Sequence, residues 1–321
     1  MLHTDLKEDD IHILSGSESV HEAENLSNKK VYIAIHRTLG NMLSENFDSL
    51  NNLMSSLKIG IRVFDEAHVE FKNICNINSF SNVLYTIYLT ATPRRSQFKE
   101  NSLYKKVFGS IPYFDGLNKS GENYHTVLLV EMNSHPDMRT QAYVKTKYGF
   151  NSARWAQFIA KDAYEKLYTV IKTIFTKMNL VNNSMKTAIV LPTLELIDAV
   201  NNSLSEDFPN AKIGVFTGEL KKTEDRETAL QSDVIITNDK MFDKAIDVPG
   251  LEVLINCVQF ASDVKAQQMI GRLRKNLEPN KQSIMIDVGD LGFIETVRLF
   301  KSRSRFYKKV AKSIATINMN K

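Results

Sequence analysis

The chain has 321 residues, which predicts about two domains at the usual ~100–200 residues per domain. Lys and Arg outnumber Asp and Glu by 41 to 37, for a net charge of +4, and hydrophobic residues make up 43% of the sequence. This composition excludes a chain that is disordered throughout, and 13 Gly with 7 Pro exclude a collagen-like or low-complexity chain.

Short apolar stretches alternate along the chain with amphipathic ones, a pattern typical of parallel sheets flanked by helices. Strands are expected at 11–14, 31–35, 59–64, 84–89, 126–131, 187–191, 213–216, 234–236, 253–255 and 284–286. Helices are expected at 44–57, 153–178, 194–204, 223–231 and 264–275. Polar segments at 115–124 and 133–148 are interpreted as connections or insertions, and a boundary near residue 120 divides a shorter domain from a longer one.

The cysteines and the hydropathy of the chain indicate the cellular compartment in which the protein is expected. Cys75 and Cys257 lie far apart, so neither a disulfide framework nor a paired zinc knuckle is expected. The first ten residues lack the basic-then-apolar order of a signal peptide, and no apolar run approaches the ~18 residues of a membrane span. We therefore expect a cytoplasmic protein with no membrane partner.

Two adjacent carboxylates, Asp65 and Glu66, end an apolar strand in the stretch from Ile61 to His68. In parallel-sheet nucleotide hydrolases, a carboxylate at this end of a strand holds Mg²⁺, and its neighbour activates the attacking water. A strand-to-helix turn with acidic caps would contain the same residue types. The strand that precedes the pair favours the hydrolase interpretation.

A second polar segment, from Thr90 to Pro93, follows the next predicted strand. Its two hydroxyls, on Thr90 and Thr92, could bind a carboxylate of a phosphate site. An ordinary turn stopped by the proline fits equally well.

A third segment lies on the predicted helix at 264–275. Gln268, Arg272 and Lys275 share one face of that helix, and Gly271 would let another backbone approach closely. Guanidinium groups presented in this way can stabilise charge that develops on a transferred phosphoryl group. An exposed basic helix end, favoured by the helix dipole, would show the same pattern.

Positive charge is concentrated at the carboxyl end. Residues 297–321 contain eight Lys or Arg and no acid, so the other 296 residues carry a net charge of −4. Phe300, Phe306, Val310, Ile314 and Ile317 recur at roughly helical spacing, which predicts a basic amphipathic helix. A solvated helix face and a nucleic-acid contact explain this charge equally well.

In their order and strand context, these segments resemble superfamily 2 helicases of the DEAH/DEAD-like group, the phage UvsW type among them, over nearly the whole chain. The matching segments are 65–68 for motif II, 90–92 for motif III, 188–191 with the helix after it for motif IV, 237–249 for motif V and 268–275 for motif VI. Four further segments resemble the same helicases more weakly: 31–39, 215–218, 287–290 and 302–307. The ordered set is far more specific than any single motif.

The resemblance implies an α/β protein of two RecA-like parallel-sheet lobes, with motifs II and III in residues 1–120 and motifs IV to VI in residues 121–321. It further implies ATP and Mg²⁺ in the cleft between the lobes, and duplex or branched DNA, with RNA as the alternative, across both. Catalytic roles would fall on Asp65 for the metal, Glu66 for the attacking water, Arg272 as an arginine finger, and Arg274 or Lys275 as the second finger. Nucleotide binding would involve Asp65, His68, Gln268, Asp247, Gly271 and Arg272, and coupling would involve Thr90, Thr92, His68 and Gln268. Nucleic-acid contacts would come from Thr193, Thr217, Gly218 and Thr237.

One element of the family pattern has no match, the phosphate-binding loop Gly-x-x-x-x-Gly-Lys-Ser/Thr. The single Gly-x-x-x-x-Gly runs from Gly116 to Gly121, after motif II, and continues with Glu122 and Asn123. We therefore expect the first lobe to be incomplete at its amino end, without its opening strand, this loop and the helix after it. Without the loop, the β- and γ-phosphates lose their backbone cradle and their lysine. The chain by itself is then expected neither to bind ATP tightly nor to hydrolyse it.

Smaller departures affect two other motifs. Motif VI has Lys275 where an arginine is usual, with Arg274 one residue early, and lysine cannot reproduce bidentate arginine contacts. Motif V has Ala245 where glycine is common.

Three functions stay open at this point. The first is an ATP-dependent DNA helicase or translocase, seen as its carboxyl-terminal part, for which a separate polypeptide would supply the phosphate loop. The second is a non-catalytic nucleic-acid-binding remnant. The third is an unrelated α/β enzyme, which the joint spacing of the motifs disfavours.

Overall fold

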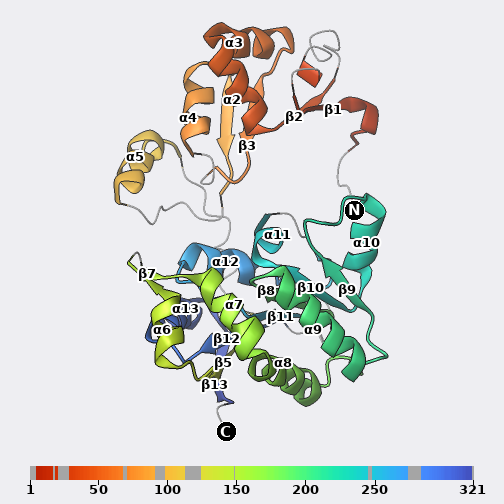
Figure 1. Cartoon of the computed structure of the whole chain (residues 1–321). Helices are drawn as coiled ribbons and strands as arrows, with labels where there is room; N and C mark the ends of the chain where they lie inside the picture. Colours follow the sequence, from red (N-terminus) through yellow and green to blue (C-terminus); the bar gives the residue numbers. More distant parts are fainter. Residues whose placement is uncertain are drawn as a thin grey trace. The chain divides into compact units, whose positions relative to one another are not determined.

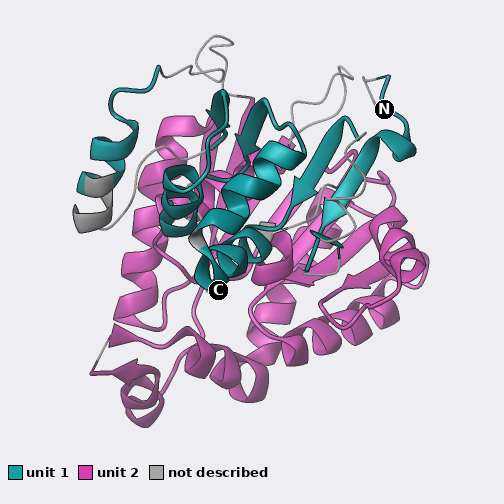
Figure 2. Cartoon of the chain, turned by 90° about the horizontal axis from the view of Figure 1, so that it is seen from above, with its two compact units in different colours: residues 1–114 teal, residues 115–321 magenta. Residues whose placement is uncertain are grey.

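The structure is a computed structural model that divides into two compact units, residues 1–114 and 115–321 (Figures 1 and 2). It describes residues 5–16, 19–20, 29–67, 71–90, 98–112, 124–147, 149–244, 248–273 and 283–319. The division lies a few residues before the boundary expected near residue 120. Within the described ranges, no helix is long and apolar enough to cross a membrane.

Unit 1 alternates short strands with helices. Its elements are η1 (Glu8–Asp10), β1 (Ile11–Leu14), β2 (Val31–Ala34), α2 (His36–Glu45), α3 (Phe47–Ser56), β3 (Ile61–Phe64), α4 (Phe71–Ser79), β4 (Tyr85–Tyr88) and α5 (Phe98–Phe108). β1 pairs with β2, and β3 with β4, both in parallel, as two separate two-stranded sheets.

The helix expected at 44–57 corresponds to α3, which begins three residues later, at Phe47. The helix before it, α2, was not expected, and the two helices are separated by Asn46. Asn46 has an extended backbone, with φ −154° and ψ 124°, and its side chain accepts a hydrogen bond from the amide of Asp48. An asparagine in this geometry caps the start of a helix, so the helical pattern restarts there.

One face of the unit 1 strands packs on helices and the other is open. Leu14 and Phe64 are buried in a core with side chains of α2, α3 and α4. On the opposite face, Ile13, Ile33 and Ile61 are 52–60% exposed, as are Val63 at 53% and Ile87 at 47%. Parallel sheets are normally covered on both faces. No element among the described residues covers this second face.

Unit 2 contains one seven-stranded, all-parallel sheet in the order β13-β5-β12-β11-β8-β10-β9. The sheet strands are β5 (His125–Met132), β8 (Thr187–Leu191), β9 (Ile213–Phe216), β10 (Val234–Asn238), β11 (Val253–Asn256), β12 (Ser283–Asp290) and β13 (Ser313–Asn318). The helices are α6 (Met138–Val144), α7 (Ser152–Asp162), α8 (Tyr164–Met178), α9 (Leu194–Asp207), α10 (Thr223–Gln231), α11 (Asp239–Lys244), α12 (Asp263–Gly271) and α13 (Ile294–Val310). A short hairpin joins β6 (Lys145–Thr146) and β7 (Gly149–Phe150).

Helices cover both faces of this sheet (Figure 1). Ile189 and Leu191 point to a core shared with α7, α8 and α9, whereas Ala188 and Val190 of the same strand join a core with α10 to α13. This alternation explains why the strands read as continuous apolar runs. The expected α/β class with parallel sheets is confirmed.

Two expectations for unit 2 helices are corrected. The helix expected at 153–178 is two helices, α7 and α8, which meet at Ala163, a residue with non-helical φ −132° and ψ 16°. The segment at 133–148, expected to be a connection, contains α6.

The basic carboxyl-terminal helix is shorter than its apolar spacing predicts. α13 ends at Val310, and Ile314 and Ile317 lie in β13, which pairs in parallel with β5. β-branched residues favour strands, and the edge of β5 offers free backbone hydrogen-bonding groups. Both factors outweigh the helical spacing of the two isoleucines.

Candidate functional site

The predicted motif II loop lies at the carboxyl end of β3, next to the end of β4. Phe64 and Tyr88 are register partners, and the amide of Leu89 donates to the carbonyl of Phe64 over 2.8 Å. The amide of Ala67 then donates to the carbonyl of Leu89 over 2.9 Å. The turn that carries Asp65 and Glu66 is thereby tied to the segment that carries Thr90.

The two carboxylates of this turn are exposed. Glu66 has φ +48°, a left-handed conformation that is rare for residues other than glycine, and its amide donates to Oδ1 of Asp65 over 2.9 Å. Buried Ala67, 0% exposed, anchors the turn beneath them. Non-glycine residues in this conformation cluster at functional sites.

The carboxylates fit a magnesium ion that is mainly ligated by water and phosphate. Mg²⁺ usually takes one or two carboxylates and keeps several waters or substrate phosphates. Among the described residues, no three His, Cys, Asp or Glu side chains are grouped as a metal site. Asp65 would therefore be one ligand among waters and phosphate oxygens.

A buried arginine that sequence reasoning missed supports this loop from the packed face of β3. Arg62, 8% exposed, donates to Oδ1 of Asn78 over 2.6 Å, to the hydroxyl of Thr86 over 3.2 Å and to the hydroxyl of Ser81. Burial lowers the pKa of Arg62. The guanidinium ties the end of α4 to β4 and thus fixes the strand that carries the carboxylates. The only sign of this role in the sequence was an arginine within a predicted strand of apolar residues.

In unit 2, the predicted nucleic-acid residues meet at the carboxyl edge of the sheet. Thr193 follows β8, Thr217 and Gly218 follow β9, and Thr237 lies in β10 between those two strands. Thr193 caps α9, because its hydroxyl accepts from the amide of Leu196 over 3.4 Å. Thr237 is 0% and Thr217 4% exposed, so the surface available to a ligand comes from Thr193 and Gly218.

Helix α12 carries the described part of the predicted motif VI. Ser262 caps it by accepting from the amide of Lys265 over 3.2 Å, and Gln268 and Arg272 are both partly exposed. Gly271 is the last helical residue, and a Cβ built on it meets no atom within 4 Å. The close backbone approach expected at Gly271 is therefore absent among the described residues.

Five predicted site residues lie outside the described residues. They are His68, Thr92, Asp247, Arg274 and Lys275.

Two polar links that the sequence did not reveal hold α12 in place. Lys265 forms an ion pair with Asp239 of α11 at 2.7 Å, which joins the predicted motif V segment to the helix that carries the predicted motif VI. Buried Arg303 of α13 donates to Asp287 over 2.8 Å and to the carbonyl of Phe260 over 2.7 Å, in the loop that leads into α12. Each link pairs groups distant in sequence, so only the fold brings them together.

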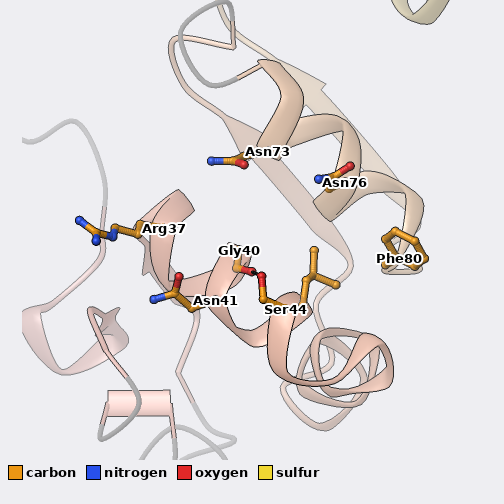
Figure 3. A pocket seen from close by; sticks show the side chains of 8 residues that line it. Arg37, Gly40, Asn41, Ser44, Asn73, Asn76 and Phe80 are labelled. Atoms are coloured by element: carbon orange, nitrogen blue, oxygen red, sulfur yellow. Dashed lines mark hydrogen bonds between the residues drawn. The ribbon is translucent and has the colours of Figure 1, made fainter.

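A cavity of about 460 Å³ in unit 1 lies between α2 and α4 (Figure 3). Its polar lining comes from Arg37, Asn41, Ser44, Asn73 and Asn76. Asp65 and Glu66 do not line it.

No protein-family model matches this sequence, and a comparison with curated proteins finds no match. Solved structures do resemble it. Saccharomyces cerevisiae Dbp5 bound to RNA and ADP BeF3 has a TM-score of 0.55 at 12% identity, over 97% of this chain and 71% of Dbp5. A fragment of a putative HsdR subunit of a type I restriction enzyme from Vibrio vulnificus has a TM-score of 0.60 at 16% identity, over 98% of this chain and 55% of that chain.

A third similar structure is the Mycobacterium smegmatis helicase Lhr bound to ssDNA and AMP-PNP. It has a TM-score of 0.55 at 13% identity, over 95% of this chain and 37% of Lhr. The chain thus spans about half or less of two of these three proteins. The likenesses confirm the expected fold class: the chain has an α/β fold with a parallel sheet, similar to that of RecA-like helicase domains.

Proposed function

We propose that this chain is part of an ATP-dependent nucleic-acid helicase or translocase, with DNA as its substrate and a UvsW-type remodelling activity. The observation that carries the proposal is the pair of exposed carboxylates at the end of β3, tied by backbone hydrogen bonds to the end of β4. The fold supports it, since Dbp5 and Lhr were solved with RNA or ssDNA and a nucleotide. Cytoplasmic localisation belongs to the same proposal.

In the proposed reaction, ATP with Mg²⁺ supplies the phosphoryl group that is transferred to water. Asp65 would hold the metal ion, and Glu66 would orient and deprotonate the attacking water. Thr90 would link hydrolysis to strand binding. Gln268 and Arg272 would contact the nucleotide from α12, with Arg272 stabilising the charge of the transition state.

The remaining motif residues keep the roles that the resemblance implies. These are His68 and Thr92 in coupling, Asp247 at the nucleotide sugar, Gly271 near the nucleotide, and Arg274 or Lys275 as the second finger. We assign the motif II and III lobe to residues 1–120 and the motif IV to VI lobe to residues 121–321. A separate polypeptide that carries the phosphate loop would complete the nucleotide site.

The test measures nucleic-acid-stimulated ATP hydrolysis by the chain, alone and with an added fragment that carries a strand, a Gly-x-x-x-x-Gly-Lys-Ser/Thr loop and a helix. We expect turnover only with the fragment. In that mixture, Glu66→Gln should lower kcat by about 100-fold or more, because a general base typically contributes 10²–10⁴-fold. In the same mixture, calorimetry should show that the Glu66→Gln variant binds nucleotide as tightly as the parent chain.

Glu45→Gln is the matched control, since Glu45 is an exposed glutamate at the end of α2 in the same unit. It should leave kcat unchanged. Equal turnover by the Glu66→Gln variant and the parent chain would contradict the role of Glu66. Strong ATPase activity without the fragment would contradict the need for a separate loop.

The alternative is a non-catalytic nucleic-acid-binding protein. The specific observation in its favour is that no glycine in the sequence begins a phosphate-binding loop. Salt-dependent nucleic-acid binding with no ATPase activity, even after the fragment is added, would favour this alternative.

A further inference from the structure

The helix α13 divides its basic residues between two faces. Its sequence from Arg298 to Lys309 contains six Lys or Arg, and its one acid, Glu295, lies in the first turn and pairs with Lys145 at 3.7 Å. Without a structure, these cations are equivalent. The structure shows which of them the fold uses.

One face of α13 is part of the unit 2 core. Phe300, Phe306 and Tyr307 are 0–9% exposed and pack against the sheet. Arg303 lies on this same face, 0% exposed, with its Nε 2.8 Å from Oδ2 of Asp287. This arginine is therefore a structural residue and is not available to a ligand.

The opposite face carries a row of four cations whose one hydrogen bond is from Nε of Arg305 to the carbonyl of Lys301 over 3.4 Å, among those found for the described residues. Arg298, Lys301, Arg305 and Lys308 are all exposed and follow one another at i, i+3, i+7 and i+10, which places them on one side of the helix. With Ser304 they line a shallow depression of about 360 Å³. No acidic side chain among the described residues forms an ion pair with any of them.

The spacing of this row suits a polyanion with regularly repeated charges. Ten residues of helix span about 15 Å, and phosphates along one strand of a duplex follow at about 3.4 Å of axial rise. The row therefore has the length of about four to five successive nucleotides. An anionic membrane surface fits less well, because an interfacial helix needs a free apolar face, and here Phe300, Phe306 and Tyr307 are buried.

We infer that the exposed row Arg298, Lys301, Arg305 and Lys308 of α13 is a second nucleic-acid contact, which binds the phosphate backbone without sequence preference. It lies outside the motif residues and extends the bound strand along unit 2. This inference rests on the proposed nucleic-acid function, and the experiment below separates the two.

The test replaces all four residues with glutamine in the full chain and measures the affinity for fluorescent single-stranded and duplex DNA as salt is titrated. We expect the affinity to fall by about tenfold or more near 100 mM salt. The slope of log K against log salt should fall by about three, since each lost phosphate contact removes 0.7–0.9. Because the four side chains are exposed, the fluorescence of buried Trp155 should report an unchanged fold.

A matched control replaces Arg139, Lys161, Lys177 and Lys212, exposed cations elsewhere on unit 2, with glutamine for the same change in net charge. It should retain the parent affinity and slope. A parent chain that binds no nucleic acid would overturn the proposed function together with this inference. Three results would overturn the inference alone. The first is normal DNA binding by the α13 variant, and the second is an equal loss of DNA affinity in the control. The third is that the parent chain binds anionic phosphatidylserine vesicles as tightly as DNA, and that the α13 variant does not bind them.

Discussion

Arg303 shows that the role of a charged residue depends on where the fold places its side chain. In the sequence it is one of eight cations in an acid-free tail. In the structure it is fully buried, donates to Asp287 and to the carbonyl of Phe260, and connects α13 to the loop before α12. Burial raises the pKa of Asp287, while Arg303 and Asn256 oppose that rise. Removing one partner of such a buried pair typically costs about 3–5 kcal/mol.

His125 is a second buried polar residue, at the start of β5. It is 8% exposed, its Nδ1 has no hydrogen-bond partner, and burial lowers its pKa to about 4. An unfolded histidine titrates near 6.5. Between these values the unfolded chain binds a proton that the folded chain does not, so the free energy of unfolding should decrease as the pH falls from about 6.5 to 4.

The expected loss attributable to His125 is about 3 kcal/mol at most. Denaturant unfolding followed by Trp155 fluorescence from pH 7.5 to 4 measures it. The difference between the parent chain and His125→Gln should shrink or reverse as the pH falls, because glutamine does not titrate. His135→Gln, at an exposed histidine, should keep the pH dependence of the parent chain. Parallel curves for His125→Gln and the parent chain would show that His125 does not cause the dependence.

Among the strands, those of unit 1 differ from those of unit 2 in how their apolar residues are used. Both sets place apolar residues on both faces of their strands, as expected for sheets buried on two faces, although His12, Arg62 and Thr86 interrupt the strands of unit 1. In unit 2 the alternate residues Ala188 and Ile189 enter two different cores. In unit 1, Phe64 is buried while its neighbour Val63 is 53% exposed. The strand sequences of unit 1 are thus suited to a second covering layer.

The packing of α10 on β9 requires glycine at one position. A Cβ on Gly214 would lie 2.5 Å from the carbonyl oxygen of Ala229 and 2.9 Å from its Cα, both backbone atoms. Gly214→Ala should therefore destabilise unit 2 by about 1–3 kcal/mol, as overpacked cores do. Urea unfolding followed by Trp155 fluorescence measures this cost.

Gly271→Ala is the matched comparison, since a Cβ there meets no atom within 4 Å. It should be neutral or slightly stabilising, because alanine favours a helix by up to about 1 kcal/mol over glycine. Equal destabilisation by both substitutions would contradict the described packing of α10 on β9.

In the whole molecule, each hydrophobic core lies within one unit. The core around Leu53 and Ile74 is formed by unit 1 residues, and the two cores on either side of the seven-stranded sheet are formed by unit 2 residues. Domains with their own cores usually fold alone. We expect residues 115–321 to fold without unit 1.

Trp155 is the single tryptophan and is 1% exposed in unit 2, so its fluorescence reports on that unit alone. The fragment should show blue-shifted emission and a cooperative urea transition within about 1 kcal/mol of the Trp155 transition in the full chain. A fragment with the emission of solvent-exposed tryptophan, or with no cooperative transition, would show that unit 2 depends on unit 1.

The sequence by itself determined the α/β class, ten strands close to their observed positions, and the attachment of Asp65 and Glu66 to the end of a strand, because strand patterns and strand-end carboxylates are local features. Tertiary structure decided what depends on distant partners. Ile314 and Ile317 lie in a strand because β13 pairs with the edge of β5. Of the basic residues of α13, Arg303 is the one that pairs with buried Asp287, and Thr237 is buried within the sheet. The periodicity of apolar residues indicates which side chains will be buried, but the segment they pack against depends on the tertiary fold.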